Sequence, residues 1–152
     1  MAASAAFETG TYRFDDRNVQ WEALGDFKHF VFSVLDVDPA KRIVDFVVKF
    51  DANERIFLHR HKAHTNTLVI QGEHRFYEPD GRLKEVRKVG TYTSSPPGEP
   101  HSEGGGSEGC IVFYSIRPES DAIFEVLDDN LKIVGTLDLP DFVSLFAAQK
   151  KA

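Results

Sequence analysis

Short runs of β-branched and aromatic residues recur along most of the chain, and turn-forming residues separate them. The first two runs are residues 27–37 and 42–50, which flank the turn sequence DPAK. The pattern continues in later runs, at residues 56–61, 65–78, 82–90, 91–95, 110–116, 123–127 and 131–137. Regularly spaced strands that do not alternate with helices predict an all-β sandwich or barrel rather than a parallel α/β sheet.

The two ends of the chain depart from this pattern. Residues 1–10 are small and end in glycine, and they predict a loose N-terminal arm. Residues 138–150 predict a short helix, because Pro140 lies near its first position and Asp141 in its first turn, with lysines in its last turn. Asp138 or Leu139 can cap this helix. The whole chain, residues 1–152, is expected to form one domain.

Composition narrows the classes of function. The chain is 41% hydrophobic and 28% charged, with a net charge of −6 and a pI of about 5.5. This charge argues against nucleic-acid binding and against anionic membranes. Cys110 is the one cysteine and cannot form an internal disulfide. There is no secretory signal and no apolar run long enough for a membrane helix, so we expect a cytoplasmic protein.

Three histidines lie close together at the start of the central runs. In a strand, His59 and His61 would face one side and Arg60 the other, with the histidine Cα atoms ~6.6 Å apart. Two imidazoles at this spacing can each present a nitrogen to a common metal ion. The same pair is also found on ordinary polar strand surfaces, so the spacing alone leaves both interpretations open.

A second segment favours the metal. Residues 90–101, GTYTSSPPGEPH, contain a glycine, a proline, a second glycine and finally His101, with the spacing of the second cupin signature. His59, His61 and Gly72 have the spacing of the first cupin signature. The chain therefore resembles the cupin superfamily, which implies a jelly-roll β-barrel of two antiparallel sheets. The resemblance also implies that His59, His61 and His101 are metal ligands.

Two positions depart from the cupin pattern. Asn53 replaces the glycine that usually opens the first signature, and the second departure matters more. Thr65 stands where a glutamate ligand is usual. We therefore expect a site of three neutral ligands, in which a divalent metal keeps its full charge and attracts an anionic, bidentate oxygen ligand. This site resembles the three-histidine cupins related to acetylacetone (β-diketone) dioxygenase and 2,4′-dihydroxyacetophenone dioxygenase.

That resemblance implies a nonheme Fe(II) enzyme that uses O₂ to cleave a C–C bond of a small carbonyl substrate. Zinc, nickel or manganese could occupy the site in the isolated protein. Related cupins are commonly homodimers or homotetramers, and we expect the same here.

Several neighbours are candidates for roles in the pocket. Thr65 could donate a hydrogen bond to substrate or leave space for it. His64 could line the rim of the pocket or be a partly exposed loop residue. The Glu99 carboxylate could accept a hydrogen bond from a ligand histidine or merely be solvated in a turn. We read His29 and His74 as surface or rim residues, and the glycine-rich residues 104–109 as a flexible loop beside His101.

Two other functions remain open. The chain also resembles the cupin domain of anti-sigma regulators, which favours a metal-binding sensor without catalysis. A metal-free sugar isomerase or epimerase on the same fold would need a His/Asp general-base pair and basic contacts to a diphosphate. The sequence shows neither feature plainly.

Overall fold

The computed structural model describes residues 13–152, so the predicted arm at residues 1–10 lies outside the described part. The described residues form strands and one helix, in the following order along the chain: β1 (Phe30–Asp38), β2 (Ile43–Phe50), β3 (His59–His61), β4 (His64–Tyr77), β5 (Leu83–Lys88), β6 (Tyr92–Ser95), β7 (Ser102–Arg117), β8 (Ala122–Leu127), β9 (Ile133–Asp138) and α1 (Leu139–Lys151).

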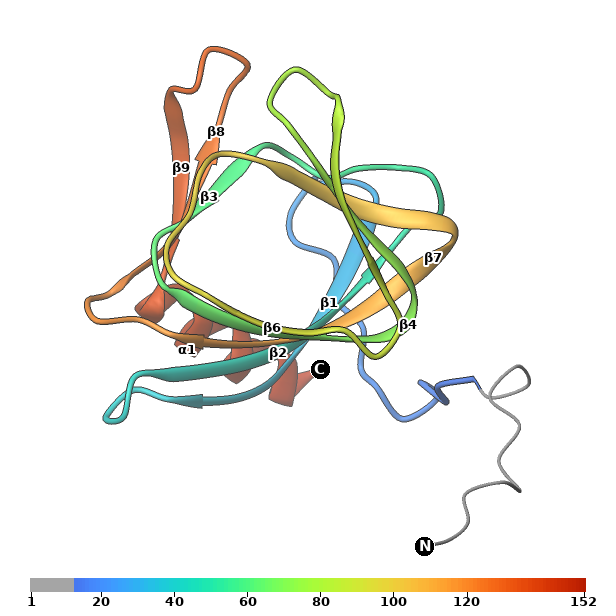
Figure 1. The fold of residues 1–152 in the computed structure, drawn as a ribbon. Coiled ribbons are helices and arrows are strands. Elements are labelled where there is room, and N and C mark those ends of the chain that lie inside the picture. The colour runs from blue at the N-terminus through green and yellow to red at the C-terminus, as the bar shows by residue number, and fades with distance from the viewer. Residues whose placement is uncertain (1–12) are drawn as a thin grey trace, which may run out of the picture.

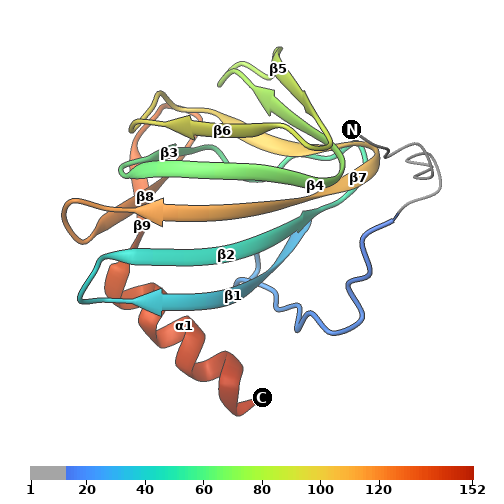
Figure 2. The ribbon, with the colours of Figure 1, turned by 60° about the horizontal axis from the view of Figure 1, so that its bottom comes forward.

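The strands form two antiparallel sheets that close around a shared interior. The larger sheet has the order β1-β2-β7-β4-β5, and β6 pairs with the other half of β4. The smaller sheet has the order β3-β8-β9. Figure 1 looks along the axis of the resulting barrel, and Figure 2 shows β1, β2, β7 and β4 side by side. The prediction of an all-β barrel of two antiparallel sheets is confirmed.

Helix α1 covers one outer face of the barrel next to β1 (Figure 2). It begins at Leu139, with Pro140 in its first turn, and the Asp141 carboxylate accepts a hydrogen bond of 2.7 Å from the Asp138 N–H. Leu139 and Phe142 are buried in the main core. The predicted C-terminal helix is therefore confirmed, and the assignment of the whole chain to one domain stays a prediction.

The glycine-rich segment is not a loop, and that expectation is wrong. Residues 104–109 lie inside β7, which runs without interruption from Ser102 to Arg117. A Cβ on Gly104 would lie 1.9 Å from the Glu54 carbonyl oxygen, and one on Gly109 would lie 2.6 Å from the Phe50 carbonyl oxygen. These glycines allow the backbone of residues 50–54 to pass very close to β7, so they serve packing rather than flexibility.

Irregular pairing between β4 and β7 changes which residues of β4 face the interior. Thr65, Thr67 and Val69 are buried, as their alternation predicts. The pairing of β4 with β7 then shifts between Val69 and Gln71 and again between Gly72 and His74. Beyond these shifts, the buried positions include His74. The prediction that His74 is a surface or rim residue is wrong, because bulges change the alternation of strand faces.

No helix within residues 13–152 could span a lipid bilayer, and α1 is too short to do so.

We predict that Gly104→Ala destabilises the fold, because its new methyl group would overlap backbone atoms that cannot move independently. The expected loss in the free energy of unfolding is about 1–3 kcal/mol, measured by urea denaturation. Gly135→Ala in β9 is the matched control, since its Cβ would meet Val126 at an ordinary 3.8 Å. Equal stabilities for the two variants would contradict this account of the glycines.

Candidate metal centre

Backbone pairing brings His59 and His101 together from distant parts of the chain. The His59 N–H donates to the His101 carbonyl at 2.9 Å, and the His101 N–H donates to the His59 carbonyl at 2.9 Å. The two residues thus form a hydrogen-bonded antiparallel pair, in which side chains lie on the same face. Since β3 belongs to the smaller sheet and His101 directly precedes β7, this pair joins the two sheets at the site.

Strand alternation adds the third histidine. In β3, His59 and His61 are buried, and the intervening Arg60 points away to donate a 2.9 Å hydrogen bond to Glu125. The predicted common face of His59 and His61 is therefore present. The ring centroids of His59 and His61 lie 5.1 Å apart, and that of His101 is 4.7 Å from His59 and 5.0 Å from His61.

Each ring is held through its Nδ1 atom. The Nδ1 atom of His59 lies 3.0 Å from the Phe57 carbonyl, and that of His101 lies 3.2 Å from the Glu99 carbonyl. Because a carbonyl only accepts, both Nδ1 atoms carry the proton. The Nδ1 atom of the third ring, His61, lies 3.1 Å from the Thr65 Oγ1 atom.

The Thr65 hydroxyl itself donates to the Ala63 carbonyl. The Thr65 oxygen must therefore accept a hydrogen bond from His61 Nδ1. In their neutral forms, all three rings point unprotonated Nε2 atoms into the interior.

These three Nε2 atoms meet a carboxylate that the sequence analysis did not assign. Glu103 Oε2 lies 2.7 Å from His59 Nε2, 3.2 Å from His61 Nε2 and 3.1 Å from His101 Nε2. Burial would raise the pKa of the Glu103 carboxyl, but the histidine nitrogens around it lower that pKa well below its usual value wherever they carry a proton to donate. Burial lowers the pKa of His61 to about 4, so this ring is neutral near pH 7.

Such an arrangement fits a cation. Several nitrogen lone pairs and a carboxylate oxygen share one buried point, where they repel one another unless a positive charge lies between them. The Nε2 atoms of His59 and His61 are 3.2 Å apart. Two ligands at 2.0–2.1 Å from one metal ion would be separated by about 2.8–3.4 Å. All four potential ligand atoms lie within 4.8 Å of one another.

Glu103 corrects the expectation of a site without a protein anion. It lies two residues after His101 in the same extended segment, so both side chains project to one face. The signal was present as His-x-Glu, but reading residues 104–109 as a loop hid the strand that continues through it. With Glu103 as a ligand, a bound divalent ion would keep a net charge of +1 rather than +2.

Two further buried residues hold the other oxygen of Glu103. The Tyr114 hydroxyl donates to Glu103 Oε1 at 2.6 Å, and His74 Nε2 lies 2.8 Å from the same atom. His74 is fully buried, and its Nδ1 atom has no hydrogen-bond partner in the described chain. The Nε2 proton is thus directed to Glu103. Burial and then the Glu103 charge raise the pKa of Tyr114 well above its usual value, so the phenol keeps its proton.

The other residues for which the sequence analysis considered a position at the pocket or the surface do not all lie where they were expected. Thr65 is buried and orients His61, as described above. His64 is partly exposed, with Nε2 2.7 Å from Ser94 Oγ, and it lines neither cavity described below. Glu99 is exposed, and its carbonyl oxygen, not its carboxylate, accepts from His101. His29 lies at the surface near Asp51, as expected.

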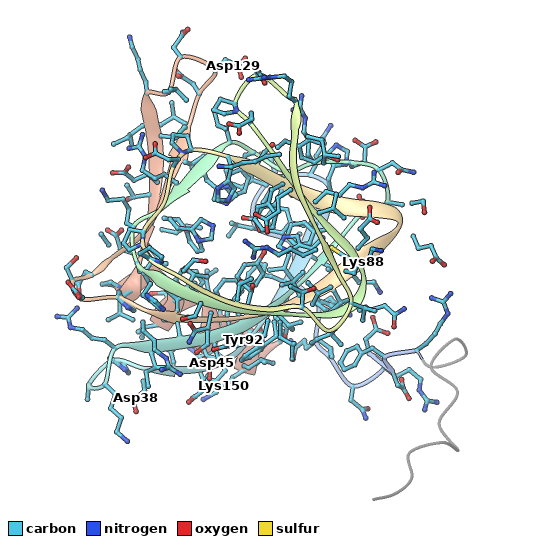
Figure 3. All side chains as sticks on the ribbon, in the orientation of Figure 1. Asp38, Asp45, Lys88, Tyr92, Asp129 and Lys150 are labelled. Atoms are coloured by element: carbon cyan, nitrogen blue, oxygen red, sulfur yellow. The ribbon has the colours of Figure 1, made fainter. Side chains whose placement is uncertain are left out.

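Two cavities reach the site from different directions. The side chains fill much of the barrel interior (Figure 3), and these cavities are the spaces they leave. One cavity, of ≈ 440 Å³ including space open to solvent, is bordered by His61, His101 and polar side chains. The other, of ≈ 580 Å³ on the same basis, is lined mainly by aromatic and aliphatic residues and reaches His59. Glu103 and Tyr114 line both cavities.

Comparison with known proteins agrees with this architecture. The chain belongs to the family of ChrR cupin-like domains, whose model matches residues 7–119. A search of curated protein sequences finds no match.

Solved structures share the fold at low sequence identity. An RmlC-like cupin protein from Ralstonia eutropha is similar with a TM-score of 0.72 and 16% identity, over 93% of this chain and 87% of that one. An acetylacetone dioxygenase from Acinetobacter johnsonii has a TM-score of 0.68 and 12% identity over 91% of each chain. A polyketide cyclase from Streptomyces resistomycificus has a TM-score of 0.58 and 20% identity, over 91% and 98%.

We predict that Tyr114→Phe weakens metal binding about 10-fold, because Glu103 loses the hydroxyl that fixes its orientation. The measurement is a competition titration of the metal-free protein with Zn²⁺ and a chromogenic chelator. Tyr92→Phe is the control, since Tyr92 is 61% exposed and lies outside both cavities. A Tyr114→Phe protein with unchanged zinc affinity would show that the hydroxyl does not support the ligand.

Proposed function

We propose that the protein is a metal-dependent cupin dioxygenase that cleaves a C–C bond of a β-diketone or hydroxyacetophenone-type compound with O₂. His59, His61, His101 and Glu103 would hold the metal, with Fe(II) as the first choice. When bound, the ion would supply Lewis acidity and the redox chemistry that O₂ requires. The observation that carries the proposal is the convergence of three Nδ1-anchored histidines and one carboxylate beside a polar cavity.

The residues of this chain would prepare the site in three ways. Glu103 would neutralise part of the charge of the ion, and Tyr114 would keep its carboxylate in place. Thr65 would fix the ring of His61, a positioning role rather than contact with the reacting atoms. The apolar wall of the larger cavity would exclude water and leave room for an alkyl or aryl group of the substrate.

Comparisons support the choice of reaction without establishing it. The similar structure from Acinetobacter johnsonii is an acetylacetone dioxygenase, and a four-ligand protein site leaves two positions of a six-coordinate ion for small molecules. A bidentate dicarbonyl compound suits such a pair of positions. The cytoplasmic location and the homodimeric or homotetrameric state remain predictions.

The test combines metal analysis with oxygen consumption. We expect about one metal ion per chain, and O₂ uptake by anaerobically Fe(II)-loaded protein when diketones or hydroxyacetophenones are added. His101→Ala should lose most metal affinity, by more than the ~10–100-fold typical for loss of a group that only supports a ligand. Elemental analysis and an oxygen electrode provide both readouts.

His29→Asn is the matched control for removing a histidine. His29 is a surface residue at φ 76°, a backbone conformation that asparagine tolerates. This variant should keep full metal content and O₂ uptake. A wild-type protein that neither contains metal when isolated nor consumes O₂ after Fe(II) loading would contradict the proposed function.

A second candidate is a regulatory metal-binding domain without catalysis. Membership in the ChrR cupin-like family favours it, since the sequence also resembles the cupin domain of anti-sigma regulators. Stoichiometric metal binding without O₂ uptake for any carbonyl compound of the panel would favour this candidate over the dioxygenase.

A further inference from the structure

The polar cavity contains a cation that the metal site does not use. Arg87, in β5, is the one lysine or arginine among the described residues that line either cavity. Its side chain is only 14% exposed. The chain has a net charge of −6, and this arginine lies in a cavity beside a candidate metal centre. Its guanidinium group would suit an anionic ligand in that cavity.

The guanidinium is held in a fixed position by contacts on several sides. Arg87 Nη1 donates to Thr93 Oγ1 at 2.9 Å and to Thr67 Oγ1 at 3.3 Å, while its carbon Cζ lies 4.2 Å from the centroid of the Phe76 ring. Arg87 Nε donates to Glu85 Oε2 at 2.6 Å, and Nη2 lies at a longer 3.5 Å from Glu85 Oε1. Nη2 therefore retains donor capacity, because a guanidinium has five N–H groups.

Glu85 compensates the charge only in part. Its side chain is 46% exposed, so solvent screens its interaction with Arg87. The salt bridge holds Nε and, at the longer distance, Nη2, whereas Nη1 contacts the hydroxyls of Thr67 and Thr93, which line the cavity. An anionic ligand could therefore approach Arg87 without displacing Glu85.

The path from the metal centre to Arg87 follows one face of β4. Thr65 contacts His61, and Thr67, two residues further along the strand, contacts Arg87. Same-face neighbours in a strand are about 7 Å apart. An anionic group near Arg87 would thus lie several bonds away from oxygens that bind at the metal centre.

We propose that the polar cavity selects a carbonyl substrate that carries a remote carboxylate, with Arg87 as the residue that determines this specificity. Ser95 and Thr93, which also line the cavity, add hydroxyl groups for an oxygen-rich ligand. This inference rests on the proposed function, because it assumes that dicarbonyl oxygens bind at the metal centre.

A matched pair of ligands tests it. 4,6-Dioxoheptanoate and 2,4-heptanedione share the same β-diketone, and a terminal carboxylate in the first replaces a methyl group in the second. Binding to anaerobic Fe(II)-loaded protein is measured by titration calorimetry, which does not depend on turnover. We expect the acid to bind about 10- to 100-fold more tightly, the range of a charge-assisted hydrogen bond.

Arg87→Gln should remove this preference and leave affinity for the neutral diketone nearly unchanged. Arg87→Lys should keep part of it, because the charge remains. Arg82→Gln is the control on the same hairpin, since Arg82 is 78% exposed and lines neither cavity. Melting temperature and metal content confirm that each variant is folded and loaded.

The outcomes separate the two proposals. Equal affinity of the wild type for both ligands, or an equal loss of both in Arg87→Gln, would overturn the role of Arg87 and leave the dioxygenase proposal intact. Binding of neither ligand to the wild type would contradict dicarbonyl binding at the metal, and both proposals would fail.

Discussion

The carboxylate of Glu103 is buried at the point where three imidazole rings meet, and the site is organised around that negative charge. One oxygen lies against the Nε2 atoms of the histidines, and the other is held by Tyr114 and His74. Burying a carboxylate is costly unless it is paired and hydrogen-bonded. A cation between Glu103 and the three rings would satisfy it, which is why the geometry is that of a metal centre rather than of a hydrophobic core.

The barrel places these groups with little freedom. The reciprocal backbone hydrogen bonds between His59 and His101 join the two sheets where the ligands lie, so any shift in register would separate the imidazoles. Glycines in β7 let residues 50–54 pass close by, which keeps the segment around Glu103 extended and buried. The packing of the fold and the geometry of the site therefore depend on the same stretch of β7.

The sequence predicted the parts of the site that follow regular strand geometry. His59 and His61 share a face because alternate residues do, and the second cupin signature identified His101 as their partner. The sequence analysis did not assign Glu103 and placed His74 at the surface or rim, and the two errors have different physical reasons. The glycines after Glu103 indicated a loop, although they permit close backbone packing, and the extra residue of β4 between Val69 and Gln71 turned His74 inward. Neither close packing nor a bulge has a clear signature in a single sequence. The single-domain assignment remains a prediction.

The central claim is that Glu103 completes a four-residue metal centre with the three histidines. Anomalous diffraction from crystals of the zinc-loaded protein tests it most directly. We expect one strong peak about 2.0–2.2 Å from the Nε2 atoms of His59, His61 and His101 and from a carboxylate oxygen of Glu103. A peak elsewhere, or a metal bound by the histidines with Glu103 turned away, would contradict it.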